Sequence, residues 1–192
     1  MKANGYSPEG YYNSNRVIAA AINRMYHGVN GAKFDEVANK LQFDVFTVFR
    51  DRQITKKNTT LQNTSGYLRV IKARNICDDG TIQDIDGYDT YISPDVCETL
   101  SVAKFLGEED VYLTPNMTYN PRVIRNKENV IPDGSVAILI PKYDFPVLDE
   151  QLAYFATTEY RAFYAIARNL STQSINVDKT SVFFYGLLKY DN

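Results

Sequence analysis

The chain has few of the residues that build metal centres and many catalytic sites. Its 192 residues include one histidine, two cysteines and no tryptophan. A structural zinc site takes four Cys, His or acidic ligands in characteristic spacings, and these three residues offer no such pattern. Cys77 and Cys97 lie twenty positions apart, and we interpret them as buried, reduced thiols of a cytosolic protein. His27 follows a predicted helix, and we interpret it as a capping or surface residue.

Motifs for nucleotide cofactors and for hydrolysis are also missing. The sequence contains no GxGxxG or GxxxxGKS loop, which would cradle phosphates, and no GxSxG nucleophile motif. No apolar run approaches the roughly 18 residues that cross a bilayer. The opening MKANGYSPEG lacks the apolar segment of a signal peptide. We therefore expect a cytoplasmic protein that binds no membrane and holds no metal or cofactor of its own.

The charge is distributed unevenly along the chain, although its sum is only −2. Residues 50–76 contain seven Lys and Arg and one acid, whereas residues 77–110 contain ten acids and one Lys. A basic segment followed by an acidic one implies a polarised surface. The acids lack the alternating spacing of a calcium loop, so a solvated face is the simpler interpretation. A magnesium-dependent nuclease that uses Asp84 or Asp86 stays open as an alternative.

Hydrophobic periodicity predicts helices and strands in an order typical of α+β proteins. Helices are expected at 16–26, 34–41, 95–105, 149–155 and 158–168. Strands are expected at 43–49, 67–76, 81–85, 111–114, 135–140 and 181–188, with 88–92 and 123–124 extended. The apolar segment 135–140 is expected at the centre of the sheet. We predict a mixed β-sheet core with flanking helices, with residues 1–33 as an N-terminal helical extension and 34–192 as the main domain.

Three polar loops carry residue types that contact nucleic acids. Phosphates attract Lys and Arg, while base edges are read by Arg, Asn and Gln. The first loop carries Arg50, Arg52, Gln53, Lys56, Lys57 and Asn58; the second Asn116, Thr118, Tyr119, Asn120, Arg122 and Arg125; the third Arg168, Asn169, Ser171, Thr172, Gln173 and Ser174. Ordinary solvated loops have a similar composition, so composition alone leaves both interpretations open.

Several phrases of the sequence resemble one known family. The phrases FRDRQITK (49–56), RVIKARNI (69–76) and GYDTYI (87–92) are similar to the C-terminal target recognition region of adenine-N6 DNA methyltransferases of type IIS restriction-modification systems (the Alw26I/Eco31I/Esp3I group). The resemblance continues in order through 115–122, 134–142, 160–164, 169–178 and 182–186, and covers roughly residues 34–189. The layout is also similar to the target recognition domains of type I specificity subunits.

This resemblance implies that residues 34–192 form a DNA target recognition domain with the corresponding fold. It implies sequence-specific binding of double-stranded DNA, which delivers an adenine to a methyltransferase domain or subunit. The glycine loop for S-adenosylmethionine and the Asn/Asp-Pro-Pro-Tyr/Phe motif are missing. We therefore expect S-adenosylmethionine and methyl transfer in that partner, and no catalysis by this chain alone.

The residues expected to contact DNA combine the three loops with one arginine of the predicted strand 67–76. They are Arg50, Arg52, Gln53, Lys56, Lys57, Arg74, Asn116, Thr118, Tyr119, Arg122, Arg168, Asn169, Thr172 and Gln173. Besides the nuclease, a protein-interaction module that docks a basic partner on its acidic face is an alternative function.

Overall fold

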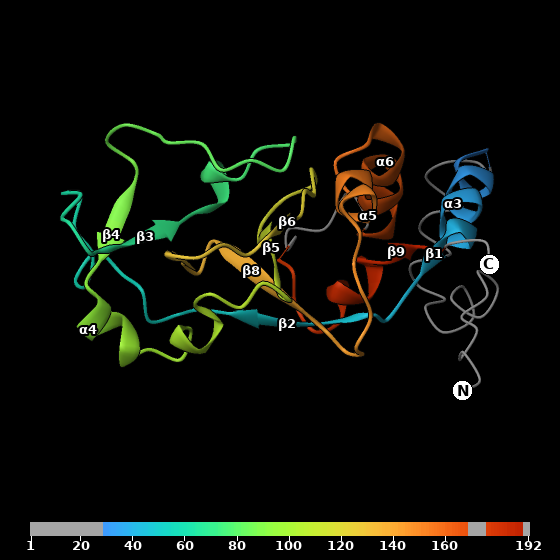
Figure 1. Cartoon of the computed structure of the whole chain (residues 1–192). Helices are drawn as coiled ribbons and strands as arrows, with labels where there is room; N and C mark the ends of the chain where they lie inside the picture. Colours follow the sequence, from blue (N-terminus) through green and yellow to red (C-terminus); the bar gives the residue numbers. More distant parts are fainter. Residues whose placement is uncertain (1–28, 169–175, 190–192) are drawn as a thin grey trace.

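The computed structural model describes residues 29–168 and 176–189 and has an α+β fold with a mixed sheet (Figure 1). The predicted helix 16–26 lies outside the described residues, as do the expected DNA contacts Asn169, Thr172 and Gln173. Among the described helices, none combines the length and the apolar character needed to cross a membrane.

A four-stranded antiparallel sheet occupies the middle of the molecule, in the order β2–β8–β5–β6. The strands are β2 (Phe46–Arg50), β5 (Tyr112–Pro115), β6 (Ile124–Arg125) and β8 (Val136–Pro141). Strand β8 pairs with β2 on one side and β5 on the other. The expectation of a central strand at 135–140 is confirmed, and its apolar run follows from burial on both faces.

A second sheet, of three strands, lies beyond the first and contains the parallel pairing that makes the fold mixed. Strand β3 (Leu68–Ile71) runs antiparallel to β4 (Thr90–Ile92) and parallel to β7 (Val130–Pro132). The predicted strand 67–76 therefore ends early, and a 3₁₀-helix over Ala73–Asn75 follows it. The cause is buried Asn75, whose side-chain Oδ1 accepts a hydrogen bond of 3.0 Å from the backbone N–H of Lys72.

Helices cover the opposite end of the molecule. They are α3 (Val29–Lys40), α5 (Asp149–Tyr154) and α6 (Thr158–Ala167), beside a two-stranded sheet of β1 (Leu41–Gln42) and β9 (Leu187–Leu188). Thr157 Oγ1 caps α6 by accepting from the N–H of Tyr160 at 3.1 Å, as the sequence predicts. Phe34 of α3 stacks on Phe163 of α6, with ring centroids 4.7 Å apart. The predicted domain boundary between residues 33 and 34 falls inside α3.

Three further predicted elements differ from the observed ones. The helix expected at 95–105 is α4 (Pro94–Glu98) followed by a separate 3₁₀-helix, Ala103–Phe105. The strand expected at 181–188 is a 3₁₀-helix, Ser181–Phe184, followed by β9, because Ser181 Oγ accepts from the N–H of Asp178 at 2.7 Å and closes a turn. The strand expected at 81–85 is reduced to one bridge between Ile76 and Ile82.

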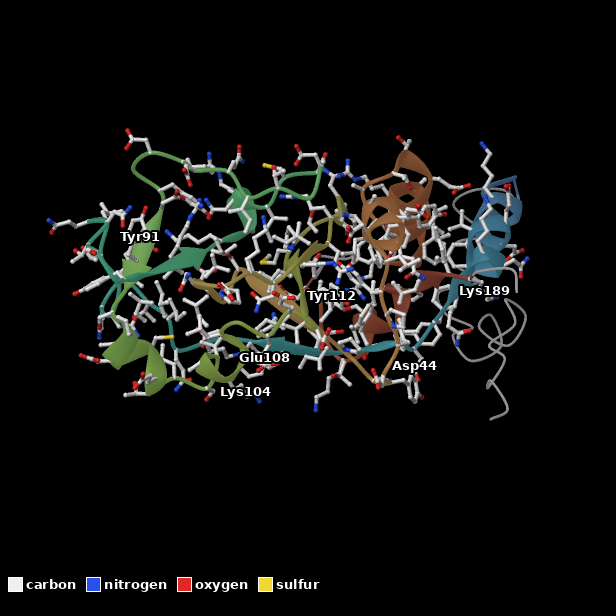
Figure 2. All side chains as sticks on the ribbon, viewed as in Figure 1. Asp44, Tyr91, Lys104, Glu108, Tyr112 and Lys189 are labelled. Atoms are coloured by element: carbon white, nitrogen blue, oxygen red, sulfur yellow. The ribbon has the colours of Figure 1, made fainter. Side chains whose placement is uncertain are left out.

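The two faces of the central sheet contribute to different hydrophobic clusters. Ala137 and Leu139 of β8 pack with the helical side, whereas Val136 and Ile138 pack with the three-stranded sheet and α4. This alternation is the period of two expected for a strand. Tyr112 of β5 is 2% exposed and lies near the centre of the molecule (Figure 2). The central sheet is therefore a scaffold with helices on one face and the three-stranded sheet on the other.

Candidate nucleic-acid interface

The loop after β2 is held in place by two side chains that cap its backbone. Asp51 is 3% exposed, and its Oδ2 accepts hydrogen bonds from the N–H groups of Gln53 (2.9 Å) and Ile54 (2.7 Å). Asn58 Oδ1 accepts from the N–H of Thr55 at 2.7 Å, and its Nδ2 donates to the carbonyl of Gln53 at 3.0 Å. Such side-chain bonds give a loop a fixed shape without regular secondary structure.

A glycine allows the base of this loop to pack directly on the central sheet. A Cβ placed on Gly134, two residues before β8, would lie 2.7 Å from the backbone oxygen of Asp51. No real Cβ contact is that short, so a larger residue would push the loop away from the sheet. The position of the loop therefore depends on both the cap at Asp51 and the absence of a side chain at Gly134.

Three cationic side chains project from this loop into solvent. Arg52, Lys56 and Lys57 are exposed, and none of them forms a side-chain hydrogen bond or ion pair with another residue of the described ranges. We call residues 52–57 the basic loop. Gln53 differs from its neighbours, because its Oε1 accepts from the N–H of Ser101 at 2.7 Å. That bond links the basic loop to the segment after α4.

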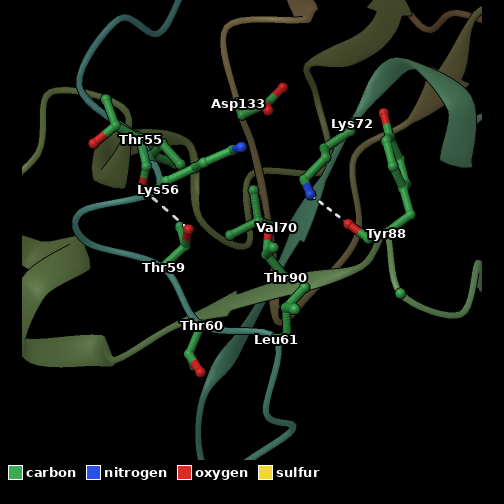
Figure 3. Close-up of a pocket in the computed structure, with 12 residues that line it drawn as sticks. Thr55, Lys56, Thr59, Thr60, Leu61, Val70, Lys72, Tyr88, Thr90 and Asp133 are labelled. Atoms are coloured by element: carbon green, nitrogen blue, oxygen red, sulfur yellow. Dashed lines mark hydrogen bonds between the residues drawn. The ribbon is translucent and has the colours of Figure 1, made fainter.

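A cavity of about 700 Å³ lies between the basic loop and the three-stranded sheet (Figure 3). Lys56 lines it from the loop, and Lys72 lines it from the end of β3. The ammonium of Lys72 donates to the carbonyl of Tyr88 and lies 4.5 Å from the centre of its ring. Burial lowers the pKa of Lys72, nearby Asp133 opposes that shift, and the like charge of Lys56 adds to it. Arg74 also lies over the Tyr88 ring, 5.0 Å from its centre.

The second predicted loop contacts other segments of the chain more than it contacts solvent, beginning with Asn116. Asn116 is only 4% exposed, and its Oδ1 accepts from Arg50 (3.3 Å) and from the N–H of Val177 (3.1 Å). Its Nδ2 donates to the carbonyl of Gly134 at 3.4 Å. The side chains of Arg50 and Asn116 therefore bind each other, and Asn116 connects the end of β5 to the chain after residue 176. Asn116 does not lie on the surface where DNA would meet it.

Arg122 is also engaged with the protein backbone. Its guanidinium donates to the carbonyls of Ile76 (2.7 Å), Ala73 (3.1 Å) and Asn120 (3.0 Å), and its side chain is 18% exposed. Burial lowers the pKa of this guanidinium, and Asp78, 3.8 Å away, opposes the shift. Arg122 therefore fastens the segment after β3 to the second loop, a structural role that the sequence did not indicate.

The remaining predicted contacts are half-buried or engaged. Thr118 Oγ1 accepts from the N–H of Asn120 at 2.8 Å, and Tyr119 is half-exposed. Arg168 is half-buried and donates to the carbonyl of Asn176 at 3.3 Å. Of the three predicted loops, only the first presents several exposed cations without partners in the part of the chain that is described.

Four of the ten acids of the segment 77–110 pair with arginines or cap their own turns, namely Asp78, Asp79, Asp84 and Asp89. Arg69 bridges Asp84 (2.6 Å) and Asp89 (3.0 Å), and Arg161 of α6 lies 2.7 Å from Asp78. No sequence pattern indicated this role of Arg161, because it lies in a predicted helix far along the chain from Asp78. Within residues 29–168 and 176–189, no three Asp, Glu, His or Cys side chains gather closely enough to hold a metal ion. The nuclease alternative gains no support from these residues.

No protein-family model matches the sequence, and no curated protein matches it significantly.

Proposed function

We propose that this protein binds duplex DNA sequence-specifically, as the target recognition part of a cytoplasmic adenine-N6 methyltransferase of a restriction-modification system. Methyl transfer and S-adenosylmethionine then belong to a partner domain or subunit. The observation that carries the proposal is the basic loop, in which Arg52, Lys56 and Lys57 are exposed on a backbone fixed by buried Asp51. The family resemblance over residues 34–189 supports the same function.

Unpaired cations on a fixed loop suit the physics of DNA binding. Each Lys or Arg that meets a phosphate releases condensed counterions, which is the main source of affinity. A loop that is already ordered loses less conformational entropy on binding than a flexible one. Because Arg52, Lys56 and Lys57 form no ion pair with residues 29–168 or 176–189, no pair within these ranges has to break when a phosphate approaches.

Among the side chains of the basic loop, Arg52 is better suited than Gln53 to the proposed reading of bases. A bidentate contact to adenine needs both the oxygen and the nitrogen of a Gln side chain, and the oxygen of Gln53 is already bonded to Ser101. Arg52 carries a guanidinium, whose two parallel donors match the O6 and N7 of guanine. We therefore propose Arg52 as the base-reading residue of the loop, with Lys56 and Lys57 on phosphates.

The test is duplex binding measured by fluorescence anisotropy over a range of salt concentrations. A selection from randomised duplexes supplies the preferred sequence. For that sequence, Lys56→Ala/Lys57→Ala should weaken binding and reduce the slope of log K against log salt by about 1.8, or about 0.9 per lost phosphate contact. The effect of Arg52→Ala alone should be larger on the selected duplex than on a scrambled one, because only base reading distinguishes them.

A matched control removes the same charge from the other end of the molecule. Lys33 of α3 and Lys179 are exposed and lie outside the basic loop, so Lys33→Ala/Lys179→Ala should leave the salt slope unchanged. Equal effects of the two double variants would mean that net charge, rather than the basic loop, determines binding. Absence of duplex binding by the wild-type chain, both alone and with a methyltransferase subunit, would refute the proposal.

A further inference from the structure

The cavity beneath the basic loop has features of a second binding site, separate from any duplex surface. Its volume of about 700 Å³ lies within the range of about 300–1,000 Å³ that is usual for small-molecule pockets. Lys56 and Lys72 come from different segments, and Figure 3 shows both ammonium groups directed toward the space over Val70. Burial is the main cause of the lowered pKa of Lys72, and the like charge of Lys56, which faces the same cavity, adds to it.

Lys72 has donors that the fold does not use. An ammonium carries three N–H groups, and the single hydrogen bond of the Lys72 ammonium within the described residues is to the carbonyl of Tyr88. No carboxylate of those residues lies within ion-pair distance of it. The Tyr88 carbonyl and the more distant carboxylates of Asp133 and Asp89 compensate only part of the hydration that this half-buried cation loses, because burial still lowers its pKa. An anion in the cavity would therefore stabilise it.

The cavity also contains polar groups that suit a hydroxylated ligand. Asp133 lines it, and its Oδ1 accepts from the N–H (2.9 Å) and the hydroxyl (2.5 Å) of Ser135. Its Oδ2 has no hydrogen-bond partner in the described part of the chain. Thr90 Oγ1, at the cavity wall, is buried and likewise has no partner there. Buried polar groups are normally hydrogen-bonded, and exceptions often mark a missing ligand or water.

We propose that this cavity binds a small phosphorylated sugar or mononucleotide. The phosphoryl group accepts hydrogen bonds from Lys56 and Lys72, and a sugar hydroxyl donates to Oδ2 of Asp133. The apolar side chains of Ile54, Leu61 and Val70 line the remaining wall.

The same phosphoryl chemistry is present in the backbone of duplex DNA, but the geometry favours the small ligand. Lys56 is exposed at the rim, whereas Lys72 is half-buried at the end of β3. A phosphate in a duplex is flanked by sugars and bases on both sides and reaches the rim, while a terminal phosphate on a small molecule reaches both ammonium groups. A contact between the phosphate and Lys72 therefore distinguishes a small phosphorylated ligand from duplex DNA.

Isothermal titration calorimetry on the full chain tests the proposal with five probes: inorganic phosphate, ribose 5-phosphate, adenosine monophosphate, ribose and a short duplex. Ribose 5-phosphate or adenosine monophosphate should bind more tightly than inorganic phosphate, and ribose should not bind. Lys72→Met should weaken that binding by about tenfold or more, as expected for the loss of a charge-assisted hydrogen bond. Lys72→Met should leave duplex binding unchanged.

Lys57→Met is the matched control, because Lys57 is the next residue of the basic loop but does not line the cavity. It should keep the affinity for ribose 5-phosphate and weaken only duplex binding. If Lys72→Met proves unstable in thermal unfolding, Lys56→Met tests the binding of ribose 5-phosphate alone, because Lys56 also belongs to the basic loop and its loss should weaken duplex binding too. The proposal is overturned if no phosphorylated probe binds, if the Lys72 and Lys56 variants bind it as tightly as the wild type, or if Lys57→Met loses it equally.

Discussion

Replacement of Asp51 by alanine should both destabilise the fold and release the basic loop. The carboxylate accepts two backbone hydrogen bonds, from Gln53 at 2.9 Å and Ile54 at 2.7 Å, in a site that is 3% exposed. Hydrogen bonds to a charged group contribute about 1.5–3 kcal/mol each to stability. The buried Oδ1 of Asp51 has no partner in the described structure, and its desolvation offsets part of this gain, about 1–3 kcal/mol. The net loss expected for Asp51→Ala is therefore about 2–4 kcal/mol.

Chemical denaturation and hydrogen exchange measure the two consequences separately. The free energy of unfolding of Asp51→Ala should fall by the amount above, and the amides of Gln53 and Ile54 should exchange faster. Asp51→Asn keeps an oxygen acceptor without the charge, so its loss should be smaller and the two amides should stay partly protected. Duplex affinity should fall as the exchange rates of the loop amides rise, because the cations of the loop would lose their fixed positions.

Two results would refute this reasoning. Unfolding of Asp51→Ala at the same denaturant concentration as the wild type would mean that the two hydrogen bonds make no net contribution to stability. Exchange of the loop amides at wild-type rates in a destabilised variant would mean that Asn58 and the contact to Gly134 hold the loop by themselves.

Three further substitutions test separate parts of the structure. Gly134→Ala places a Cβ 2.7 Å from the oxygen of Asp51 and should cost about 1–3 kcal/mol in denaturation experiments, as overpacking does; unchanged stability would contradict the tight contact. Arg122→Met should lower the thermal midpoint, because three carbonyls lose their donor, without altering the salt slope of duplex binding. Glu159→Gln tests a pH effect. Hydrogen bonding to Lys40 lowers the pKa of Glu159 from 4.5. The contribution of Glu159 to folding stability is therefore present above pH 4.5 and is lost as the pH falls through the lowered pKa. The difference between wild type and Glu159→Gln should be at most about 0.5 kcal/mol at neutral pH, as for exposed ion pairs, and should vanish in acid; a difference that persists there would rule out titration of Glu159 as its cause.

The scaffold was predictable where the local pattern and the final environment agree. The apolar run of β8 predicts a strand buried on both faces, and Thr157 before α6 predicts a helix start; both are observed. The early end of β3 was not predictable in this way, because the alternation continues past residue 71. It depends on Asn75, which is buried and bonds back to Lys72. That bond also turns Lys72 away from the sheet pattern and toward Tyr88.

The candidate site was predictable only where its residues act locally. The caps of the basic loop join residues two to five positions apart, so a polar loop with exposed cations follows from the sequence. The long-range partners of Asn116 and Arg122 are Arg50, Val177, Ile76 and Ala73, which lie between 46 and 66 positions away. The composition of the loop shows the amide of Asn116 and the guanidinium of Arg122 among polar residues. That both side chains face inward follows only from the fold. The position of Lys56 opposite Lys72 in the cavity depends on the fold in the same way.

Lys56 connects the two proposals, because it belongs to the basic loop and also lines the cavity. If both proposals hold, its single ammonium cannot serve a duplex phosphate and a phosphoryl group in the cavity with full strength at the same time. Saturating ribose 5-phosphate should therefore weaken duplex binding, by about fivefold, the lower end of typical coupling between sites. Linkage requires that the duplex weaken ribose 5-phosphate binding by the same factor, which anisotropy and calorimetry measure independently. Lys56→Met should abolish the coupling, whereas Lys57→Met should weaken duplex binding and leave the coupling intact. Equal duplex affinity with and without the bound small ligand would show that Lys56 is not shared.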